Sequence, residues 1–312
     1  MDAITALEVV NGVDLTGRTC VITGASAGLG RESARALAAT GAHVVLAARN
    51  PSALAEAEDW VRAEVPQAMT STVALDLTSL AGVRAAAAAI RRIAPAIHVL
   101  MNNAGVMFTP FSRTADGFEI QFGTNHLGHF ELTRLLIPQL VAAGGARIVI
   151  LSSDGHQMGD VDLDDPNWRR RDYDKFVAYG ASKTANILHM VELDRRLRDS
   201  GVRAYSVHPG VVATSLARHM NRDDFKSLSR MTPVHTDPGR TAIDVRRDFT
   251  MPEHGAATQV WAAVSPELAD VGSVYLADCA VHDNVVPYAV DEKHALALWE
   301  LSERLCVVGA EQ

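Results

Sequence analysis

The alternation of two kinds of segment is the feature of this sequence that most restricts its fold. Between Thr19 and Val207, short runs rich in β-branched residues alternate with longer segments rich in Ala, Leu and Arg. This alternation is typical of parallel strands joined by crossover helices. The strand runs are hydrophobic almost throughout, which indicates strands covered on both faces. We therefore expect an α/β fold with a doubly wound parallel sheet of about seven strands and helices on both faces.

The expected elements can be stated as ranges. Strands are predicted at Thr19–Thr23, His43–Ala47, Thr70–Leu75, His98–Asn102, Arg147–Leu151, Arg203–Val207 and Ser273–Leu276. Helices are predicted at Leu29–Thr40, Ser52–Val65, Leu80–Ala94, Gly117–Ala143, Phe176–Ser200, Glu253–Ala263 and Asp291–Leu305. Residues 154–175 and 211–250 interrupt the rhythm and are interpreted as insertions beside a substrate site, the first as a candidate lid. No linker rich in Pro, Gly or Ser divides the chain, so residues 1–312 are expected to form one domain.

Charge and cysteine content limit the partners. The formal net charge is −8, whereas nucleic acids and anionic membranes attract basic surfaces. We expect small-molecule partners, no nucleic acid and no membrane. Cys20, Cys279 and Cys306 lie far apart without CxxC spacing, which favours a reducing compartment. The first residues lack the apolar run of a secretion signal, so a cytoplasmic location is expected.

A glycine-rich turn follows the first predicted strand. Gly24, Gly28 and Gly30 have GxxxGxG spacing, with Ser26, Ala27 and Leu29 among the residues between them. Glycines here allow a tight turn and let a pyrophosphate approach the N–H groups of a helix N-terminus. The same pattern alone also fits a flexible turn without a ligand.

The end of the second predicted strand bears on the choice of dinucleotide. Units that bind NAD usually place an acidic residue here, which bonds to the adenosine ribose. This chain has Arg49 instead. A guanidinium group matches a 2′-phosphate, which predicts NADP (NADPH) as cofactor. The alternative is that Arg49 only solvates an exposed turn.

Two further motifs carry a resemblance to a known family. Asn102-Asn103-Ala104-Gly105 follows the fourth predicted strand, and Tyr179-Gly180-Ala181-Ser182-Lys183 lies on a later predicted helix. With the glycine turn, and in this order, they make the chain resemble the short-chain dehydrogenase/reductase family over almost its whole length. Asp14-Leu15-Thr16-Gly17 and Leu298-Trp299-Glu300-Leu301-Ser302 are similar to a branch containing retinol dehydrogenases, WW-domain oxidoreductases and protochlorophyllide reductases. The resemblance implies a Rossmann fold and hydride transfer with a nicotinamide dinucleotide.

Tyr179 and Lys183 are the first candidate catalytic pair. Residues four apart on a helix share one face, and an ammonium group near a phenol favours the phenolate. Without the other motifs, such a pair would more often be a surface pair. The resemblance implies that Tyr179 is the general acid in carbonyl reduction and the general base in alcohol oxidation. It also implies that Lys183 holds the nicotinamide ribose.

Two more catalytic roles are implied by the resemblance. Ser152 and Ser153 end the fifth strand, at the edge where open α/β sheets bind ligands. The second position of the family motif is Ser153, which would polarise the substrate carbonyl. Ser152 is the alternative, and a simple strand-end serine is another. Asn125 matches the asparagine that bends the central helix and holds a water near Lys183, although an ordinary helix amide is also conceivable.

Other residues are expected around the cofactor by resemblance. Asp76 and Leu77 match the adenine-contacting pair, and Asn103, Ala104 and Gly105 would brace the cofactor. Pro209, Gly210, Val212 and Thr214 match the segment that fixes the nicotinamide carboxamide. The histidines His126, His129, His156, His189 and His208 lack the spacing of a zinc site, so no metal is expected. His156 is expected at the mouth of the substrate site.

Three functions compete at this stage. The favoured one is an NADP-dependent carbonyl reductase or alcohol dehydrogenase for a moderately large apolar ketone, aldehyde or secondary alcohol. The second is carbon–carbon double-bond reduction of the protochlorophyllide-reductase type. The third is a non-catalytic cofactor-binding regulatory protein, against which the complete set of Asn125, Ser153, Tyr179 and Lys183 argues. The resemblance also implies that the long helices beside the sheet could form the contacts of a homo-oligomer.

Overall fold

One sheet of eight strands runs through the computed structural model, which describes residues 4–212, 215–220, 224 and 249–308. The strands are β1 (Thr19–Thr23), β2 (His43–Ala48), β3 (Met69–Ala74), β4 (Val99–Asn102), β5 (Arg147–Leu151), β6 (Arg203–Val207), β7 (Val274–Ala277) and β8 (Ala280–Val281). Their order is β3-β2-β1-β4-β5-β6-β7-β8. Strands β1 to β7 are parallel, and β8 pairs antiparallel with β7. The predicted doubly wound parallel sheet is confirmed, while the short edge strand β8 was not predicted.

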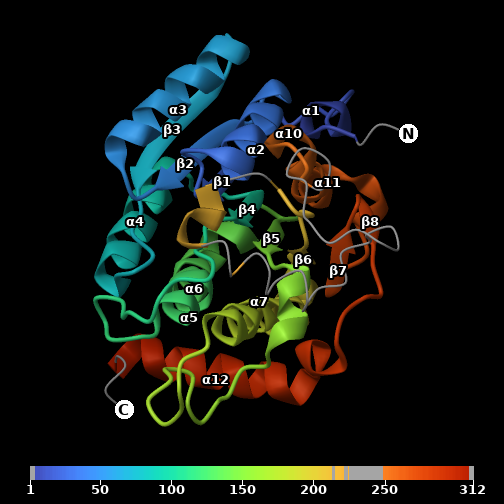
Figure 1. Cartoon of the computed structure of the whole chain (residues 1–312). Helices are drawn as coiled ribbons and strands as arrows, with labels where there is room; N and C mark the ends of the chain where they lie inside the picture. Colours follow the sequence, from blue (N-terminus) through green and yellow to red (C-terminus); the bar gives the residue numbers. More distant parts are fainter. Residues whose placement is uncertain (1–3, 213–214, 221–223, 225–248, 309–312) are drawn as a thin grey trace, which may run out of the picture.

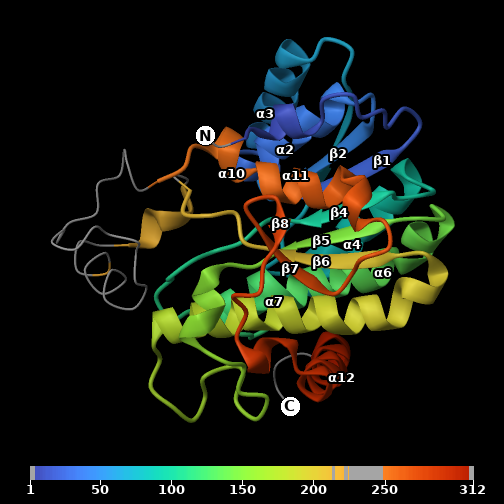
Figure 2. The same ribbon diagram turned by 90° about the vertical axis from the view of Figure 1, so that its right-hand side faces the viewer.

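Helices cover both faces of the sheet (Figure 1). One face carries α1 (Ala6–Val9), α2 (Gly28–Ala39), α3 (Pro51–Glu64), α10 (Pro252–Gly255) and α11 (Ala257–Val264). The other carries α4 (Leu80–Ile93), α5 (Ile120–Phe122), α6 (Gly128–Ala142) and α7 (Lys175–Leu197). Helix α12 (Glu292–Val308) lies outside α7, as Figure 2 shows. No helix in the described part of the chain combines the length and apolarity that a membrane crossing requires.

The two faces of the sheet explain the hydrophobic strand runs. Successive strand residues point to opposite faces. In β1, Val21 packs into the core below α4, α6 and α7, whereas Cys20 and Ile22 pack into the core below α2, α3 and α11. Both cores need apolar residues, so the strand sequences show little polar alternation.

The strand order reverses between β1 and β4. The chain first builds β1, β2 and β3 to one side and then returns to place β4, β5 and β6 on the other. The crossover helices separate at this point and leave a crevice at the carboxyl edge of the sheet, where open α/β folds bind ligands.

The helix predicted over Gly117–Ala143 is present from Ile120 to Ala142, but it is not a regular α-helix throughout. The chain forms only the short α5, then a π-helical turn, Gly123–Leu127, and then α6. Asn125 lies at the centre of this turn. Such turns are rare and occur frequently at functional sites. The helix predicted over Glu253–Ala263 likewise divides into α10 and α11.

Candidate active site

A cavity of about 850 Å³ lies at the carboxyl edge of the sheet. Its size suits a small molecule or cofactor. Its walls include every predicted cofactor-binding residue that the structure describes: Gly24, Ser26, Ala27, Gly28, Leu29, Gly30, Arg49, Asp76, Leu77, Asn103, Ala104, Gly105, Tyr179, Lys183, Pro209, Gly210 and Val212. Thr214 lies outside the described residues. We call the part around Gly24–Gly30, Arg49 and Asp76 the turn end, and the part around Ser153, Tyr179 and Lys183 the phenol end.

Close backbone approach shapes the glycine turn. Gly24 has φ +68°, and a Cβ there would lie 2.9 Å from the Cα of Ala104 and 3.0 Å from Nδ2 of Asn103. Asn103 Nδ2 in turn donates to the Thr23 carbonyl at 2.8 Å. A larger residue at position 24 would therefore separate the turn from the loop after β4. The N-cap residue of α2 is Ala27, which forms no side-chain cap hydrogen bond, so the first N–H groups of the helix are left to an anion within the described part of the site.

Arg49 and Asp76 lie at the outer part of the turn end. Arg49 is exposed and follows β2 directly. It has no carboxylate partner among the residues that the structure describes, so its guanidinium is available to a ligand. Asp76 is half-buried, and its Oδ1 accepts from the N–H and the hydroxyl of Thr78 at 2.9 and 2.7 Å. These bonds fix the chain that follows β3 against the cavity.

Helix α7 presents Tyr179 and Lys183 to the phenol end. The Asp174 carboxylate caps this helix by accepting from the N–H groups of Phe176 and Val177. Lys183 Nζ lies 5.6 Å from the centre of the Tyr179 ring and donates to the Leu151 carbonyl at 3.1 Å. The predicted neighbourhood of the two side chains is therefore present.

Burial shifts the titration of both groups. It raises the pKa of Tyr179 to about 12, against a smaller lowering by the hydrogen bond with Ser153. It lowers the pKa of Lys183 to about 8. In each case the charged form loses hydration. Tyr179 thus keeps its proton at neutral pH and is able to act as an acid. The expectation that the Lys183 ammonium favours the phenolate is wrong for this protein without bound nucleotide, because burial dominates the pKa of Tyr179. Shifted groups in a cavity are a mark of functional sites.

The two adjacent serines point to different partners. Ser152 Oγ donates to the carbonyl oxygen of Lys183 at 2.9 Å, which uses it in packing β5 against α7. The Ser153 side chain is close enough to Tyr179 to lower the pKa of the phenol against the effect of burial, and it accepts from the N–H of Gly155 at 3.0 Å. Of the two serines, Ser153 is therefore the one whose side chain lies beside the phenol of Tyr179.

Gly180 permits a close contact beside Tyr179. A Cβ at this position would lie 2.7 Å from the Gly159 nitrogen and 2.9 Å from the Gly155 carbonyl oxygen. The turn that follows Ser153 therefore rests directly on the backbone of α7. A side chain at position 180 would push Ser153 away from the phenol.

Asn125 lies behind the cavity wall and is fully buried. Its Oδ1 accepts from the Val106 N–H at 2.8 Å, and its Nδ2 donates to the Val106 carbonyl at 2.9 Å. Nδ2 also donates to Ser182 Oγ at 2.9 Å, one residue before Lys183. Asn125 thus connects the loop after β4 with α7.

The sequence did not reveal the apolar wall next to Tyr179. Met107, Phe108, Met158 and Met220 line this part of the cavity. The rings of Phe108 and Tyr179 lie 4.9 Å apart, and Phe108 has φ +51°. Its N–H donates to Gln121 Oε1 at 2.8 Å, which holds this strained conformation. A single backbone dihedral leaves no periodic signal in a sequence.

The 154–175 segment mostly lies away from the cavity. Of its residues, only Asp154, Gly155 and Met158 line the wall. Trp168 instead packs against Tyr173, with ring centres 5.2 Å apart, and against the Arg171 guanidinium at 3.9 Å. A lid movement of this segment remains a prediction. Most of the second predicted insertion, 211–250, lies outside the described residues.

The placement predicted for His156 is wrong. This side chain is fully buried and does not line the cavity. Its Nδ1 lies 2.8 Å from the Ser153 carbonyl, and its Nε2 accepts from the Val286 N–H at 3.3 Å. His156 therefore supports the segment of Ser153 from behind. In the described part of the chain, no three His, Cys, Asp or Glu side chains are grouped as metal ligands.

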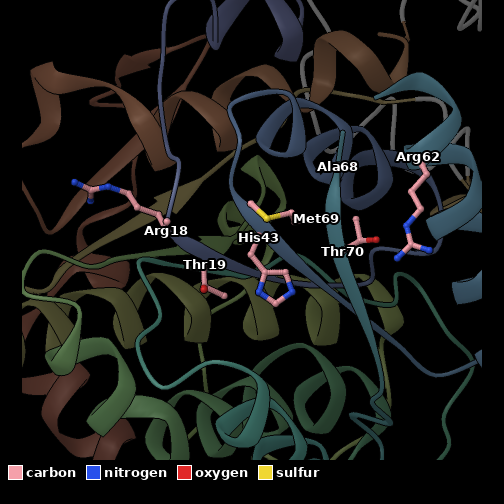
Figure 3. Close-up of a pocket in the computed structure, with 8 residues that line it drawn as sticks. Arg18, Thr19, His43, Arg62, Ala68, Met69 and Thr70 are labelled. Atoms are coloured by element: carbon pink, nitrogen blue, oxygen red, sulfur yellow. The ribbon is translucent and has the colours of Figure 1, made fainter. Parts of the chain in front are cut away.

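A second hollow, of about 560 Å³, lies at the opposite edge of the sheet (Figure 3). Arg18, Thr19, His43, Arg62 and Met69 are among its lining residues. These belong to the amino ends of β1, β2 and β3 and to α3, so the catalytic candidates do not reach it. Arg62 is already paired with Glu58 at 2.9 Å.

The fold and the phenol end together define a class of protein. It is a doubly wound α/β protein with a tyrosine and a lysine in the cavity at the carboxyl edge of its sheet. The profile of the family described as short chain dehydrogenase matches residues 18–224. Human retinol dehydrogenase 13 is 40% identical over 299 residues, covering 95% of this chain and 86% of that protein. Human WW domain-containing oxidoreductase is 38% identical over 314 residues, covering 96% and 71%.

A solved structure agrees with these relatives. The crystal structure of an uncharacterized protein from Mycobacterium Paratuberculosis superimposes with a TM-score of 0.74 at 34% identity, covering 98% of each chain. The chain belongs to the short-chain dehydrogenase/reductase family of oxidoreductases, in a branch with retinol dehydrogenases and WW domain-containing oxidoreductases.

Proposed function

We propose that the chain transfers a hydride between NADP and the carbonyl or alcohol carbon of a moderately large apolar ketone, aldehyde or secondary alcohol. One observation carries this proposal. Ser153, Tyr179 and Lys183 meet at one end of a single cavity, whose other end holds the glycine turn and Arg49. Its cytoplasmic location and its assembly as a homo-oligomer remain predictions.

The cavity walls fit a nicotinamide dinucleotide. The uncapped N–H groups of α2 and the close-packed glycine turn suit a pyrophosphate. Arg49 suits a 2′-phosphate, Asp76 and Leu77 an adenine, and Lys183 with Tyr179 a ribose. Pro209, Gly210 and Val212 suit a carboxamide. When bound, the nicotinamide supplies a hydride for reduction or accepts one in oxidation.

Tyr179 is the proton donor in the reduction that we propose. Burial raises the pKa of its phenol to about 12, so the proton is present at neutral pH. The Ser153 hydroxyl orients the carbonyl oxygen towards the phenol by donating to it. The phenolate left behind is stabilised by the ammonium of Lys183, whose charge acts strongly where water is excluded.

The apolar wall beside Tyr179 favours an apolar substrate. Met107, Met158 and Met220 are flexible side chains that adapt to ligands of different shape, and Phe108 adds a rigid ring beside Tyr179. Some of the relatives, such as human retinol dehydrogenase 13, are named for retinol, a large apolar alcohol. An apolar carbonyl compound therefore suits this end better than a sugar or an acid.

NADPH consumption over a series of aldehydes and ketones of rising apolar size tests the proposal. We expect turnover with NADPH that increases with the apolar size of the substrate, and an alcohol as product. A product with a saturated carbon–carbon bond and an intact carbonyl would instead support the double-bond reductase. Tight NADPH binding without turnover over the whole series would support the regulatory protein.

A further inference from the structure

His129 of α6 joins two elements of the site without lining the cavity. It follows Asn125 by four residues, so both lie on one side of the helical segment. Its ring is buried, with 1% of its surface exposed. Nδ1 lies 3.0 Å from the Asn125 carbonyl oxygen, and Nε2 lies 2.9 Å from Thr23 Oγ1.

These partners determine the position of the imidazole proton. A carbonyl oxygen only accepts, so Nδ1 of His129 must carry the hydrogen. Burial outweighs the opposite effect of the hydrogen bond to the Asn125 carbonyl and, with a smaller contribution from the charge of Lys183, lowers the pKa of His129 to about 4, so the ring is neutral at physiological pH. Nε2 then has a free lone pair and accepts from the hydroxyl of Thr23.

Thr23 also forms hydrogen bonds with the loop after β4. Its Oγ1 accepts from the N–H groups of Asn103 and Ala104 at 2.9 and 3.0 Å. With its own hydrogen donated to His129, the hydroxyl is fully used. The Met101 carbonyl, at 3.4 Å, is a poorer acceptor for the same hydrogen.

Asn125, the other partner of His129, also binds the loop after β4. The side chain of Asn125 binds both the N–H and the carbonyl of Val106. A closed ring of hydrogen bonds therefore runs from the 103–106 loop through Thr23, His129 and Asn125 back to the loop. Gly105 lies within this loop on the cavity wall, and a Cβ there would lie 3.9 Å from Lys183 Nζ.

We propose that His129 is a positioning residue for the hydride-transfer reaction. Its neutral imidazole, protonated on Nδ1, ties the Asn125 carbonyl to Thr23 and so fixes the 103–106 loop relative to Lys183. The inference rests on the proposed function, because it assigns His129 an effect on that reaction. The bond to Asn125 is the decisive one, since Asn125 also holds the start of the Lys183 turn through Ser182.

His189 of α7 is a matched control. It is buried like His129 and packs against rings on both sides of that residue in the sequence, with ring centres 5.5 Å from His126 and 5.2 Å from Phe130. Neither of its ring nitrogens has a hydrogen-bond partner among the described residues. The substitution His189→Phe therefore alters the packing of these side chains without breaking the ring of hydrogen bonds.

Two substitutions separate the bonds of His129. In His129→Asn the amide nitrogen takes the place of Nδ1 and is able to donate to the Asn125 carbonyl. In His129→Gln the longer amide takes the place of Nε2 and reaches only Thr23. We expect kcat of His129→Gln to fall about tenfold to a hundredfold, as displaced catalytic groups do, while KM for the carbonyl substrate changes less than about twofold. His129→Asn should keep at least about a third of the parent kcat, and His189→Phe the same.

The comparison of variants decides the role. Equal loss of kcat in His129→Asn and His129→Gln, or no greater loss in His129→Gln than in His189→Phe, would overturn the proposal. A rise in KM without a change in kcat would also overturn it, because it would place His129 in substrate binding. A parent protein without turnover would refute the proposed function instead.

A second measurement needs neither a variant nor turnover. Imidazole nitrogen chemical shifts of the intact protein distinguish the two neutral tautomers and the charged ring. We expect His129 to remain neutral and protonated on Nδ1 between about pH 6 and pH 8, where a free histidine titrates. An Nε2-protonated ring, or a titration within this range, would refute the hydrogen-bond ring on which the proposal depends.

Discussion

The two ends of the cavity consist of different kinds of chemical group. The turn end consists of backbone N–H groups, a glycine turn with positive φ and an exposed arginine. The phenol end consists of buried side chains, with Tyr179 and Lys183 only 3% and 5% exposed. Burial shifts the pKa of both groups at the phenol end, whereas the turn end offers backbone N–H groups and an exposed charge to a ligand. Changes at the phenol end should therefore act on rate, and changes at the turn end on cofactor affinity.

Tyr179→Phe tests the phenol end most strongly. Only the hydroxyl is lost, and general acid catalysis typically contributes 10²–10⁴ in rate, so kcat should fall by at least about a hundredfold. The NADPH dissociation constant should stay near that of the parent. Steady-state kinetics and a binding titration provide the two numbers. Near-parental kcat with chemistry limiting would remove Tyr179 from the role of acid.

Ser153→Ala and Ser152→Ala compare adjacent hydroxyls. Loss of a donor to the reacting oxygen costs about a hundredfold in kcat, which we expect for Ser153→Ala. Ser152→Ala should keep kcat and lose about 1 kcal/mol of unfolding free energy, since its bond joins β5 to α7. Kinetics and urea unfolding of both variants measure this contrast. The opposite pattern would make Ser152 the catalytic serine.

Arg49 variants test the turn end. A charge-assisted hydrogen bond contributes about 1.5–3 kcal/mol, and because Arg49 is exposed we expect the lower value, about tenfold weaker NADPH binding in Arg49→Ala. NADH binding should change little.

Arg49→Asp extends this test. The carboxylate repels a 2′-phosphate and offers an acceptor to a ribose hydroxyl, so the preference should invert or vanish. Dissociation constants of both cofactors at one salt concentration check the prediction. If NADPH affinity were unaffected by both substitutions, Arg49 would have no role in cofactor choice.

Lys183 should also make the stability of the protein depend on pH. In the nucleotide-free protein, burial lowers the pKa of Lys183 to about 8 from the usual 10.5. Between these values the unfolded chain binds more protons than the folded one, so the free energy of unfolding rises with pH, by about 1 kcal/mol per pH unit. Above about pH 10 the raised pKa of Tyr179 acts in the opposite direction.

Lys183→Met should remove this rise. Urea unfolding of the parent and the variant from pH 7.5 to about pH 10 gives a difference curve, in which the contributions of other groups cancel. We expect the stability of the parent to gain on that of the variant as the pH rises. Parallel curves would mean that Lys183 is not desolvated in the folded protein.

Sequence patterns predicted most of the fold because its signals are local. The runs Thr19–Thr23, Arg147–Leu151 and Arg203–Val207 form strands with the predicted bounds. The resemblance implied that Asn125 bends the central helix, but the π-helical form of the turn over Gly123–Leu127 was not predicted, because a shift of one residue in the helical hydrogen bonds leaves no periodic signal in a sequence. The position of His156 was also missed. Its contact with Val286, 130 residues away, depends on how α12 and the preceding loop pack.

The sequence by itself determined the order of strands and helices, the glycine turn after β1 and the four-residue spacing of Tyr179 and Lys183. Each depends on neighbours within one or two helical turns. Only the tertiary structure decided which of two serines meets the phenol, that Phe108 forms the wall beside it, and that His129 bonds to Thr23 across 106 residues of chain. The reason is physical: hydrogen bonds and ring contacts depend on distances of a few ångströms, which arise only when distant segments pack together.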